Sequence, residues 1–224
     1  MNVRAILFIL FAALLGVSIV TSIMGSSGHA DVAIAESADL IQPLGAGEPA
    51  PRFFVETVDG EQFDFNPDTL QRPVVLLTFR GGWCPFCNTY LSEMRLAIPK
   101  IRELGADVLF LSGDRSEQLF RSLNMETQED IAGLDYTLLS DADAQAAMAL
   151  GIAFKASQKT IDRRLDKNQD IEGSSMLKRG VLPVPSVFAI DADGIIRFAY
   201  TNADYKVRLP ADELLNVARE ITAD

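Results

Sequence analysis

The pattern of hydrophobic and polar positions predicts buried strands that alternate with amphipathic helices. Three apolar runs rich in β-branched residues have the character of buried strands, over residues 74–79, 106–112 and 187–190. After the first run, apolar side chains recur at the spacing of one helix face, at Cys87, Leu91, Met94, Ile98 and Ile101. Pro99 falls inside this pattern and should kink or end the helix nearby.

Weaker signals extend the pattern. A turn at Val58-Asp59-Gly60 between two aromatic segments predicts a hairpin near the start of the domain. Ser116 is favourable at the start of a helix predicted to run to about Asn124. The later segments predict a strand over 136–139, a helix over 142–150, a strand over 195–200 and a closing helix over 212–222. The fold class is therefore α/β, a central mixed β-sheet flanked by helices, with an N-terminal hairpin extension.

Residues 1–30 have the pattern of an export signal. Arg4 precedes an apolar core that runs from Ala5 to about Met24, and Gly28-His29-Ala30 offers small residues for cleavage. The apolar stretch is also just long enough to span a bilayer, so an uncleaved N-terminal anchor is the alternative. Both interpretations place the domain outside the cytoplasm, in the periplasm or the extracellular space, where a disulfide can persist.

Residues 31–46 form a small-residue, acidic stretch that predicts a flexible linker, and residues 47–224 form the domain. The 224-residue chain has a net charge of −11, which argues against binding nucleic acid or anionic lipid. Its single histidine, His29, lies in the leader. Without it the domain has no Cys–His pair, no Ser–His triad and no histidine metal site, so no metal and no cofactor are expected.

The candidate chemistry lies directly after the first buried strand. The turn Arg80-Gly81-Gly82 leads into Trp83-Cys84-Pro85-Phe86-Cys87, which holds both cysteines and the only tryptophan. Pro85 suits the first position of a helix, which makes Cys84 the N-cap at an exposed tip. Helix N–H groups and the helix dipole favour a thiolate there, well below the free thiol pKa of roughly 8.5. Cys84 would attack and Cys87 resolve; a structural disulfide or two inert core cysteines are the alternatives.

Five stretches of the domain resemble one family. They are GEPAPRF, FRGGWCPFC, YTLLSDADAQAAMALGI, LPVPSVFAIDADGIIRFAY and ADYKVRLPADELL. Together they resemble the thioredoxin superfamily, and most of all its alkyl hydroperoxide reductase/thiol-specific antioxidant, or peroxiredoxin-like, branch. The resemblance implies a thioredoxin-like fold and a thiol peroxidase that reduces hydroperoxides. It also implies a Cys84–Cys87 disulfide as the oxidised form, recycled by a thioredoxin-type dithiol protein.

The site departs from the usual peroxiredoxin pattern at three positions. Leu77 and Gly81 stand where that pattern has proline and threonine or serine, and Pro185 stands where it has an arginine. Val184-Pro185 instead resembles the cis-proline of thioredoxins beside the cysteine pair, although a proline that opens a strand is also tolerated for structural reasons alone. Arg80 either supplies the missing positive charge or faces solvent at the strand end.

Two further features each have two interpretations. Trp83 either shields the cysteines or is ordinary core. The locally basic segment 153–180 is either a solvated helix and loop, or a docking face or lid over the cysteines.

Three functions remain in competition. The first is a thiol peroxidase. The second is an exported thiol–disulfide oxidoreductase acting on protein disulfides, with Pro185 lining its substrate groove. The third is a non-catalytic binding domain with a structural disulfide, since a fold by itself does not fix a function.

Overall fold

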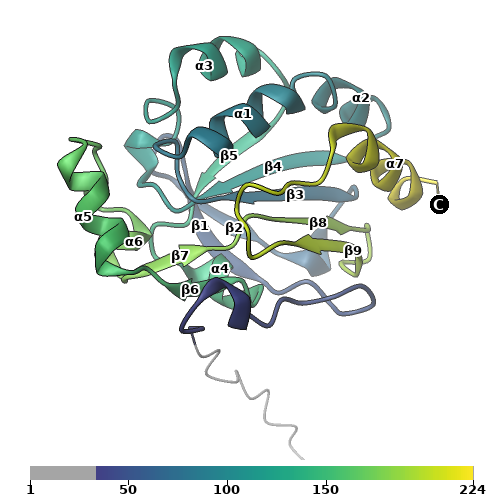
Figure 1. Ribbon diagram of the computed structural model, residues 1–224. Coiled ribbons are helices and arrows are strands. Elements are labelled where there is room, and N and C mark those ends of the chain that lie inside the picture. The colour runs from purple at the N-terminus through teal and green to yellow at the C-terminus, as the bar shows by residue number, and fades with distance from the viewer. Residues whose placement is uncertain (1–33, 224) are drawn as a thin grey trace, which may run out of the picture. The chain divides into compact units, whose positions relative to one another are not determined.

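The computed structural model describes residues 34–223, so the export segment expected over 1–30 lies outside the described residues. Seven strands of this part form one mixed sheet (Figure 1). Their spatial order is β2 (Gln62–Phe65), β1 (Phe53–Thr57), β5 (Thr137–Ser140), β4 (Asp107–Ser112), β3 (Val74–Phe79), β8 (Ser186–Ile190) and β9 (Ile196–Thr201). A separate pair consists of β6 (Ala153–Lys155) and β7 (Val181–Pro183). Strand β3 pairs in parallel with β4 and antiparallel with β8, so it lies inside the sheet.

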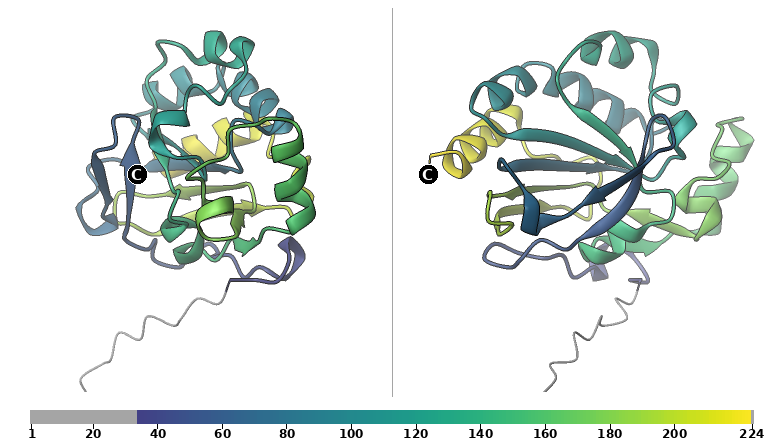
Figure 2. Two further views of the ribbon diagram at one scale, coloured as in Figure 1. Left: turned by 90° about the vertical axis from the view of Figure 1, so that its left-hand side faces the viewer. Right: turned by 180° about the vertical axis from the view of Figure 1, so that it is seen from behind.

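Helices cover both faces of the sheet (Figures 1 and 2). One face carries α1 (Pro85–Met94), α2 (Ile98–Glu103) and α7 (Ala211–Ile221), with α3 (Met125–Ile131) packed on α1. The other face carries α4 (Gln145–Ala149) and the β6–β7 pair. Helices α5 (Gln158–Asp166) and α6 (Ser175–Lys178) follow β6. The predicted α/β class, a thioredoxin-like mixed sheet between helices, is confirmed.

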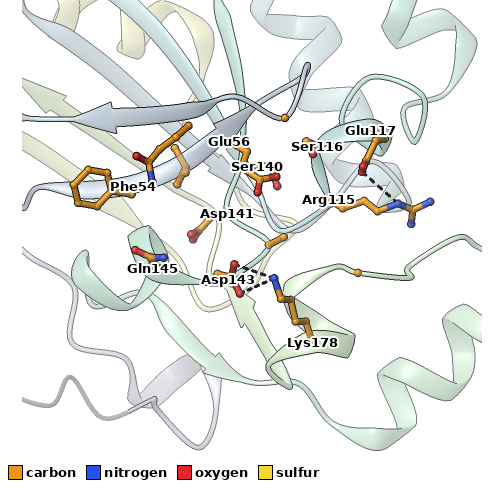
Figure 3. Close-up of a pocket in the computed structure, with 15 residues that line it drawn as sticks. Phe54, Glu56, Arg115, Ser116, Glu117, Ser140, Asp141, Asp143, Gln145 and Lys178 are labelled. Atoms are coloured by element: carbon orange, nitrogen blue, oxygen red, sulfur yellow. Dashed lines mark hydrogen bonds and ion pairs between the residues drawn. The ribbon is translucent and has the colours of Figure 1, made fainter.

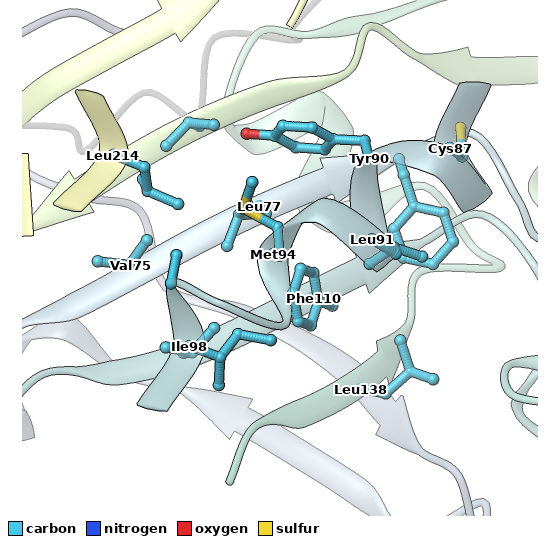
Figure 4. Packing of buried hydrophobic residues seen from close by; sticks show 14 of the residues in the cluster. Val75, Leu77, Cys87, Tyr90, Leu91, Met94, Ile98, Phe110, Leu138 and Leu214 are labelled. Carbon is cyan, nitrogen blue, oxygen red and sulfur yellow. The ribbon is translucent and has the colours of Figure 1, made fainter. Parts of the chain in front are cut away.

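The alternation of side chains along β3 explains why both faces must be covered. Val75, Leu77 and Phe79 belong to the core under the helices, whereas Val74 and Leu76 belong to the core on the opposite face. All five are at most 3% exposed. Figure 4 shows Tyr90, Leu91 and Met94 of α1 in the same core as Val75 and Leu77, with Cys87 near the N-terminal end of this helix. Each such buried side chain contributes roughly 1.5–3 kcal/mol, which fixes α1 on the sheet.

The predicted N-terminal hairpin is present and enlarges the sheet. Strands β1 and β2 pair antiparallel, and Phe53 stacks on Phe65 with ring centroids 4.6 Å apart. Strand β1 also pairs antiparallel with β5, so the hairpin adds two strands at one edge.

The prediction for Pro99 is confirmed, but the helix predicted over 116–124 is wrong. Helix α1 ends at Met94 and α2 begins at Ile98, with Pro99 in its first turn, where a missing N–H is tolerated. Residues 116–118 form only a short 3₁₀ turn. The helix starts later, at Met125, because the Asn124 side chain accepts a hydrogen bond from the Thr127 amide at 2.7 Å and caps α3.

The described part of the expected linker, residues 34–46, is attached to the domain. Ala35 donates to the Ala153 carbonyl and accepts from the Lys155 amide, and Leu44 donates to the Leu150 carbonyl at 3.1 Å. Ala38 lies in a 3₁₀ turn, Ala38–Leu40, and packs on the α4-side core. The structure differs here from a free linker because small and apolar side chains of this stretch cover the β6 edge. Within residues 34–223, no helix has the length and apolar character needed to cross a membrane.

Candidate active site

The structure places Cys84 and Cys87 at the first turn of α1. Cys84 is the N-cap, and its carbonyl accepts hydrogen bonds from the amides of Cys87 at 3.0 Å and Asn88 at 3.1 Å. Pro85 occupies the first helical position, as predicted, and is exposed. Both cysteines are free thiols, so the structure represents the reduced form.

The expectation that Cys84 sits at an exposed tip is wrong. Cys84 is only 3% exposed and Cys87 is fully buried. Phe86, not Cys84, is the exposed side chain at this turn, and it packs edge to face on Tyr205 with ring centroids 5.6 Å apart. The segment that precedes α7 therefore closes against the start of α1, a contact that no local sequence pattern signals.

The two thiols have opposite ionisation behaviour. A hydrogen bond from the Cys87 thiol, with help from the Cys87 amide and the charges of Arg80 and Arg208, lowers the pKa of Cys84 to about 6 despite burial. Burial raises the pKa of Cys87 well above its usual range, and the neighbouring Cys84 raises it further. At neutral pH Cys84 is therefore a thiolate and Cys87 a thiol. This asymmetry makes Cys84 the stronger nucleophile of the two.

Two arginines from distant parts of the chain supply the positive charge. The Arg80 guanidinium lies over the rings of Trp83 and Tyr205, 5.4 Å and 4.6 Å from their centroids. Its burial lowers its own pKa, while the nearby thiols raise it. Arg80 is thus directed at the site rather than at solvent. Arg208, which the sequence did not single out, donates from Nη2 to the Cys87 Sγ at 3.5 Å.

The pH dependence of Cys84 alkylation tests this electrostatic arrangement. With iodoacetamide, the rate should rise with pH along a curve whose midpoint is near 6, because only the thiolate reacts. Arg208→Gln should move the midpoint upward, since it removes a charge that favours the thiolate. Arg72→Gln removes the same charge from an exposed position before β3 and should leave the curve unchanged. A wild-type midpoint near 8.5, that of a free thiol, would refute the assigned environment.

Trp83 is buried beside Cys84 and connects the site to segment 153–180. Its exposure is 7%, and the Arg164 guanidinium lies 4.8 Å from its ring centroid. Its carbonyl accepts a hydrogen bond from Gln169 Nε2 at 3.1 Å. Helix α5 itself buries no residue, as expected for a solvated helix. Two side chains of the segment nevertheless contact the cysteine turn.

A buried carboxylate holds the turn that precedes the cysteines. Asp114, at the end of β4 and 2% exposed, accepts from the Gly82 amide at 2.7 Å and from the Ser122 hydroxyl at 2.8 Å. Its other oxygen, Oδ1, has no partner among the described residues. Burial raises the pKa of Asp114 to about 6, although both hydrogen bonds oppose this. No motif marked Asp114, because its partner in the turn is 32 residues away.

Asp114 makes stability depend on pH. Because its folded-state pKa lies above the unfolded value, its contribution is complete below about pH 4 and is lost as pH rises through about 6. A shift of this size corresponds to roughly 3 kcal/mol of unfolding free energy. Urea unfolding between pH 4 and 8 should show this loss in the wild type and a flatter profile in Asp114→Asn. Asp193→Asn, in an exposed turn, removes the same charge and should keep the wild-type slope; equal slopes in all three would contradict the assignment.

The cis-proline expectation is wrong. All peptide bonds among residues 34–223 are trans, including Val184–Pro185. The Val184 amide donates to the Ile152 carbonyl at 2.8 Å, and its carbonyl accepts from the hydroxyls of Thr78 at 3.2 Å and Ser186 at 2.8 Å. Both backbone polar groups of Val184 therefore have hydrogen-bond partners within the protein. Pro185 is buried and lines a small pocket together with Arg80.

A second cavity, of about 440 Å³, lies between β1, the end of β5 and α6 (Figure 3). Two of its acidic groups have partners: Asp141 accepts from the amides of Ala146 and Ala147, and Asp143 pairs with Lys178. It is lined by no cysteine. In the part of the chain that the structure describes, no three His, Cys, Asp or Glu side chains gather as a metal site would require. The chemistry therefore belongs to the cysteine turn.

Comparison with known proteins agrees with this geometry. A profile of the AhpC/TSA family matches residues 46–199. The peroxiredoxin Bcp of Escherichia coli K12 is 30% identical over 182 residues, which cover 80% of this chain and 99% of the relative. The thiol-disulfide oxidoreductase ResA of Bacillus thuringiensis is 27% identical over 148 residues, or 66% of this chain and 65% of the relative. The reduced 2-Cys peroxiredoxin of Plasmodium vivax superimposes with a TM-score of 0.58 at 17% identity, covering 81% of this chain and 83% of that structure.

The family profile covers well over half of the chain, and the bacterial peroxiredoxin aligns over almost its whole length. The reduced cysteine pair stands at the start of a helix in a thioredoxin-like fold. The chain therefore belongs to the AhpC/TSA family of peroxiredoxin-like thiol peroxidases, within the thioredoxin superfamily.

Proposed function

We propose that the protein reduces hydroperoxides in two steps at the Cys84–Cys87 pair. The Cys84 thiolate attacks the O–O bond of ROOH; with one proton taken up, ROH leaves and Cys84 becomes a sulfenic acid. The Cys87 thiol then attacks this sulfur, the sulfenic hydroxyl leaves as water with the thiol proton, and a Cys84–Cys87 disulfide forms. An external dithiol protein of the thioredoxin type reduces the disulfide and is itself oxidised.

What carries this proposal is a buried cysteine pair at a helix start, where the neighbouring Cys87 and the charges of Arg80 and Arg208 lower the pKa of Cys84. A thiolate at pKa about 6 is ready to attack at neutral pH, and Arg80 lies close enough to lower that pKa. A guanidinium next to the sulfur also suits the negative charge that develops on the leaving oxygen. No histidine is needed for any step.

The position of Cys87 supports the resolving step. It lies one helical turn from Cys84, and its amide donates a hydrogen bond to the Cys84 carbonyl at 3.0 Å. Arg208 Nη2 lies 3.5 Å from the Cys87 Sγ and lowers the cost of forming a thiolate there. Little rearrangement is needed to bring the two sulfurs into bonding distance.

The apolar segment over residues 1–30 supports a location outside the cytoplasm. Whether the segment is cleaved or retained as an anchor, the domain would act in the periplasm or the extracellular space. The reductant must then be an exported or membrane-bound dithiol protein.

The alternative is an exported thiol–disulfide oxidoreductase. The similarity to the oxidoreductase ResA and the Cys-Pro-Phe-Cys spacing favour it. The internal hydrogen bonds of Val184 speak against it, because they leave no free backbone group there for an extended peptide substrate.

Stopped-flow fluorescence of Trp83 distinguishes the two functions. Trp83 is the only tryptophan and adjoins the reacting sulfur. Mixing the reduced wild type with hydrogen peroxide should give a fast fluorescence change. In Cys84→Ser the rate of this change should be lower by roughly 10³-fold or more. A wild-type rate no greater than that of a free thiolate, together with activity in insulin reduction, would select the oxidoreductase.

A further inference from the structure

The small pocket lined by Arg80 and Pro185 has a mixed lining. Its volume is about 220 Å³. The lining combines three guanidinium groups with apolar and aromatic side chains. The arginines are Arg80, Arg163 and Arg164, and the apolar and aromatic residues include Phe154, Pro185 and Tyr205.

The three arginines of the pocket have no carboxylate partner among the described residues. Among residues 34–223, no carboxylate lies within 4 Å of Arg80, Arg163 or Arg164. Six other arginines of the same part of the chain do form ion pairs: Arg52, Arg95, Arg102, Arg115, Arg179 and Arg197. Three guanidinium groups without a carboxylate partner thus gather in one small pocket of a chain that has 31 acidic and 20 basic residues.

Two of these guanidinium groups also hold a buried donor with no acceptor. The Nε–H groups of Arg80 and Arg164 are buried and have no hydrogen-bond partner among the described residues. A buried donor without an acceptor is costly, more so when charged. The charge of Arg164 also lowers the pKa of Arg80, so the two groups repel one another. An anion between them would relieve both penalties.

The shape and lining of the pocket select the anion. A planar guanidinium fork matches a carboxylate with two parallel hydrogen bonds. The volume is below the roughly 300–1,000 Å³ typical of pockets for drug-sized ligands, which excludes large anions such as nucleotides. The side chains of Phe154, Pro185 and Tyr205 in the lining can contact an apolar part of the ligand. We propose that this pocket binds a small monocarboxylate with a short apolar chain.

Arg80 couples this pocket to the thiol. It lines the pocket, and its charge also favours the Cys84 thiolate. A carboxylate beside Arg80 offsets part of that charge, so the ligand and the thiolate oppose one another. By linkage the effect is reciprocal: loss of the thiolate charge tightens ligand binding by the same factor that the ligand disfavours the thiolate.

Hexanoate is the probe, with hexanamide as its uncharged match. Titration of the reduced full-length protein, followed by Trp83 fluorescence and by calorimetry, should show saturable binding of hexanoate and none of hexanamide. The measurement uses neither peroxide nor reductant, so its result is independent of the proposed peroxidase activity. Absence of saturable binding, or equal binding of the amide, would overturn the proposal.

Variants locate the site. Arg163→Gln and Arg164→Gln should each weaken hexanoate binding by about tenfold or more, the effect of losing a charge-assisted hydrogen bond. Arg163 is exposed, so its replacement does not endanger the fold. Arg72→Gln removes the same charge from an exposed site at the opposite end of β3 and should bind hexanoate normally. Equal weakening in all three variants would mean general charge attraction and would refute a pocket.

The coupling has its own measurement. Saturating hexanoate should slow the alkylation of Cys84 by iodoacetamide near pH 6 and move the pH midpoint upward, and Cys84→Ser should bind hexanoate more tightly than the reduced wild type. An unchanged alkylation profile with hexanoate bound would refute the shared role of Arg80.

Discussion

Cys87→Ser should leave the first reaction with peroxide intact and strongly slow the turnover that follows it. Cys84 retains its thiolate, since a serine hydroxyl also donates a hydrogen bond to it and Arg80 and Arg208 remain. Without a resolving thiol, the sulfenic acid has no internal partner and accumulates. Peroxide consumption in the presence of a dithiol donor should therefore fall by roughly 10²-fold or more, because each cycle depends on the slow external thiol.

Two measurements separate this result from general damage. Trapping with dimedone followed by mass spectrometry should label Cys84 in Cys87→Ser, and label it far less in the wild type. Stopped-flow Trp83 fluorescence should keep its fast first phase in Cys87→Ser and lose it in Cys84→Ser. Full turnover of Cys87→Ser would show that Cys87 does not resolve the intermediate and would leave it as a core residue.

Gly82→Ala should destabilise the protein by about 3 kcal/mol and disturb the cysteine turn. A Cβ atom at Gly82 would lie 2.5 Å from the Ser122 carbonyl carbon and 2.6 Å from the Leu123 amide nitrogen. Both are backbone atoms and cannot rotate away. Either the turn or the 122–123 segment must move, and the hydrogen bond from the Gly82 amide to Asp114 should weaken as a result.

Gly105→Ala is the matched control. It has φ +92° but no atom within 4 Å of the added Cβ, so it should cost only the backbone strain, about 1 kcal/mol. Urea unfolding measures both free energies, and alkylation of Cys84 reports on the turn. An equal cost in the two variants would show that the close approach at Gly82 relaxes freely, and a normal Cys84 rate in Gly82→Ala would show that the turn does not need it.

The pocket beside Arg80 has a consequence for how the site is regulated. The same guanidinium that favours the thiolate also lines the pocket proposed for the carboxylate. A carboxylate metabolite could then adjust thiol reactivity without touching the sulfur. The guanidinium groups of Arg80 and Arg164 both lie over the Trp83 ring, so Trp83 fluorescence should report this coupling.

The sequence by itself determined the strand, turn and helix that carry the cysteines. An apolar β-branched run, a glycine turn and proline at the first helical position are local signals, and each acts within a few residues. The same local logic predicted the hairpin and the break at Pro99. It failed over 116–124, where the capping side chain of Asn124 moved the helix start to Met125.

Only the tertiary structure decided what surrounds the sulfurs. Arg208 meets Cys87 across 121 residues of chain, Gln169 meets Trp83 across 86, and Asp114 meets Gly82 across 32. These contacts arise because strand order and helix packing bring distant segments to one end of β3, and no periodicity records such pairings. The burial of Cys84 has the same origin, since it depends on which segments close over the site rather than on the residues next to it.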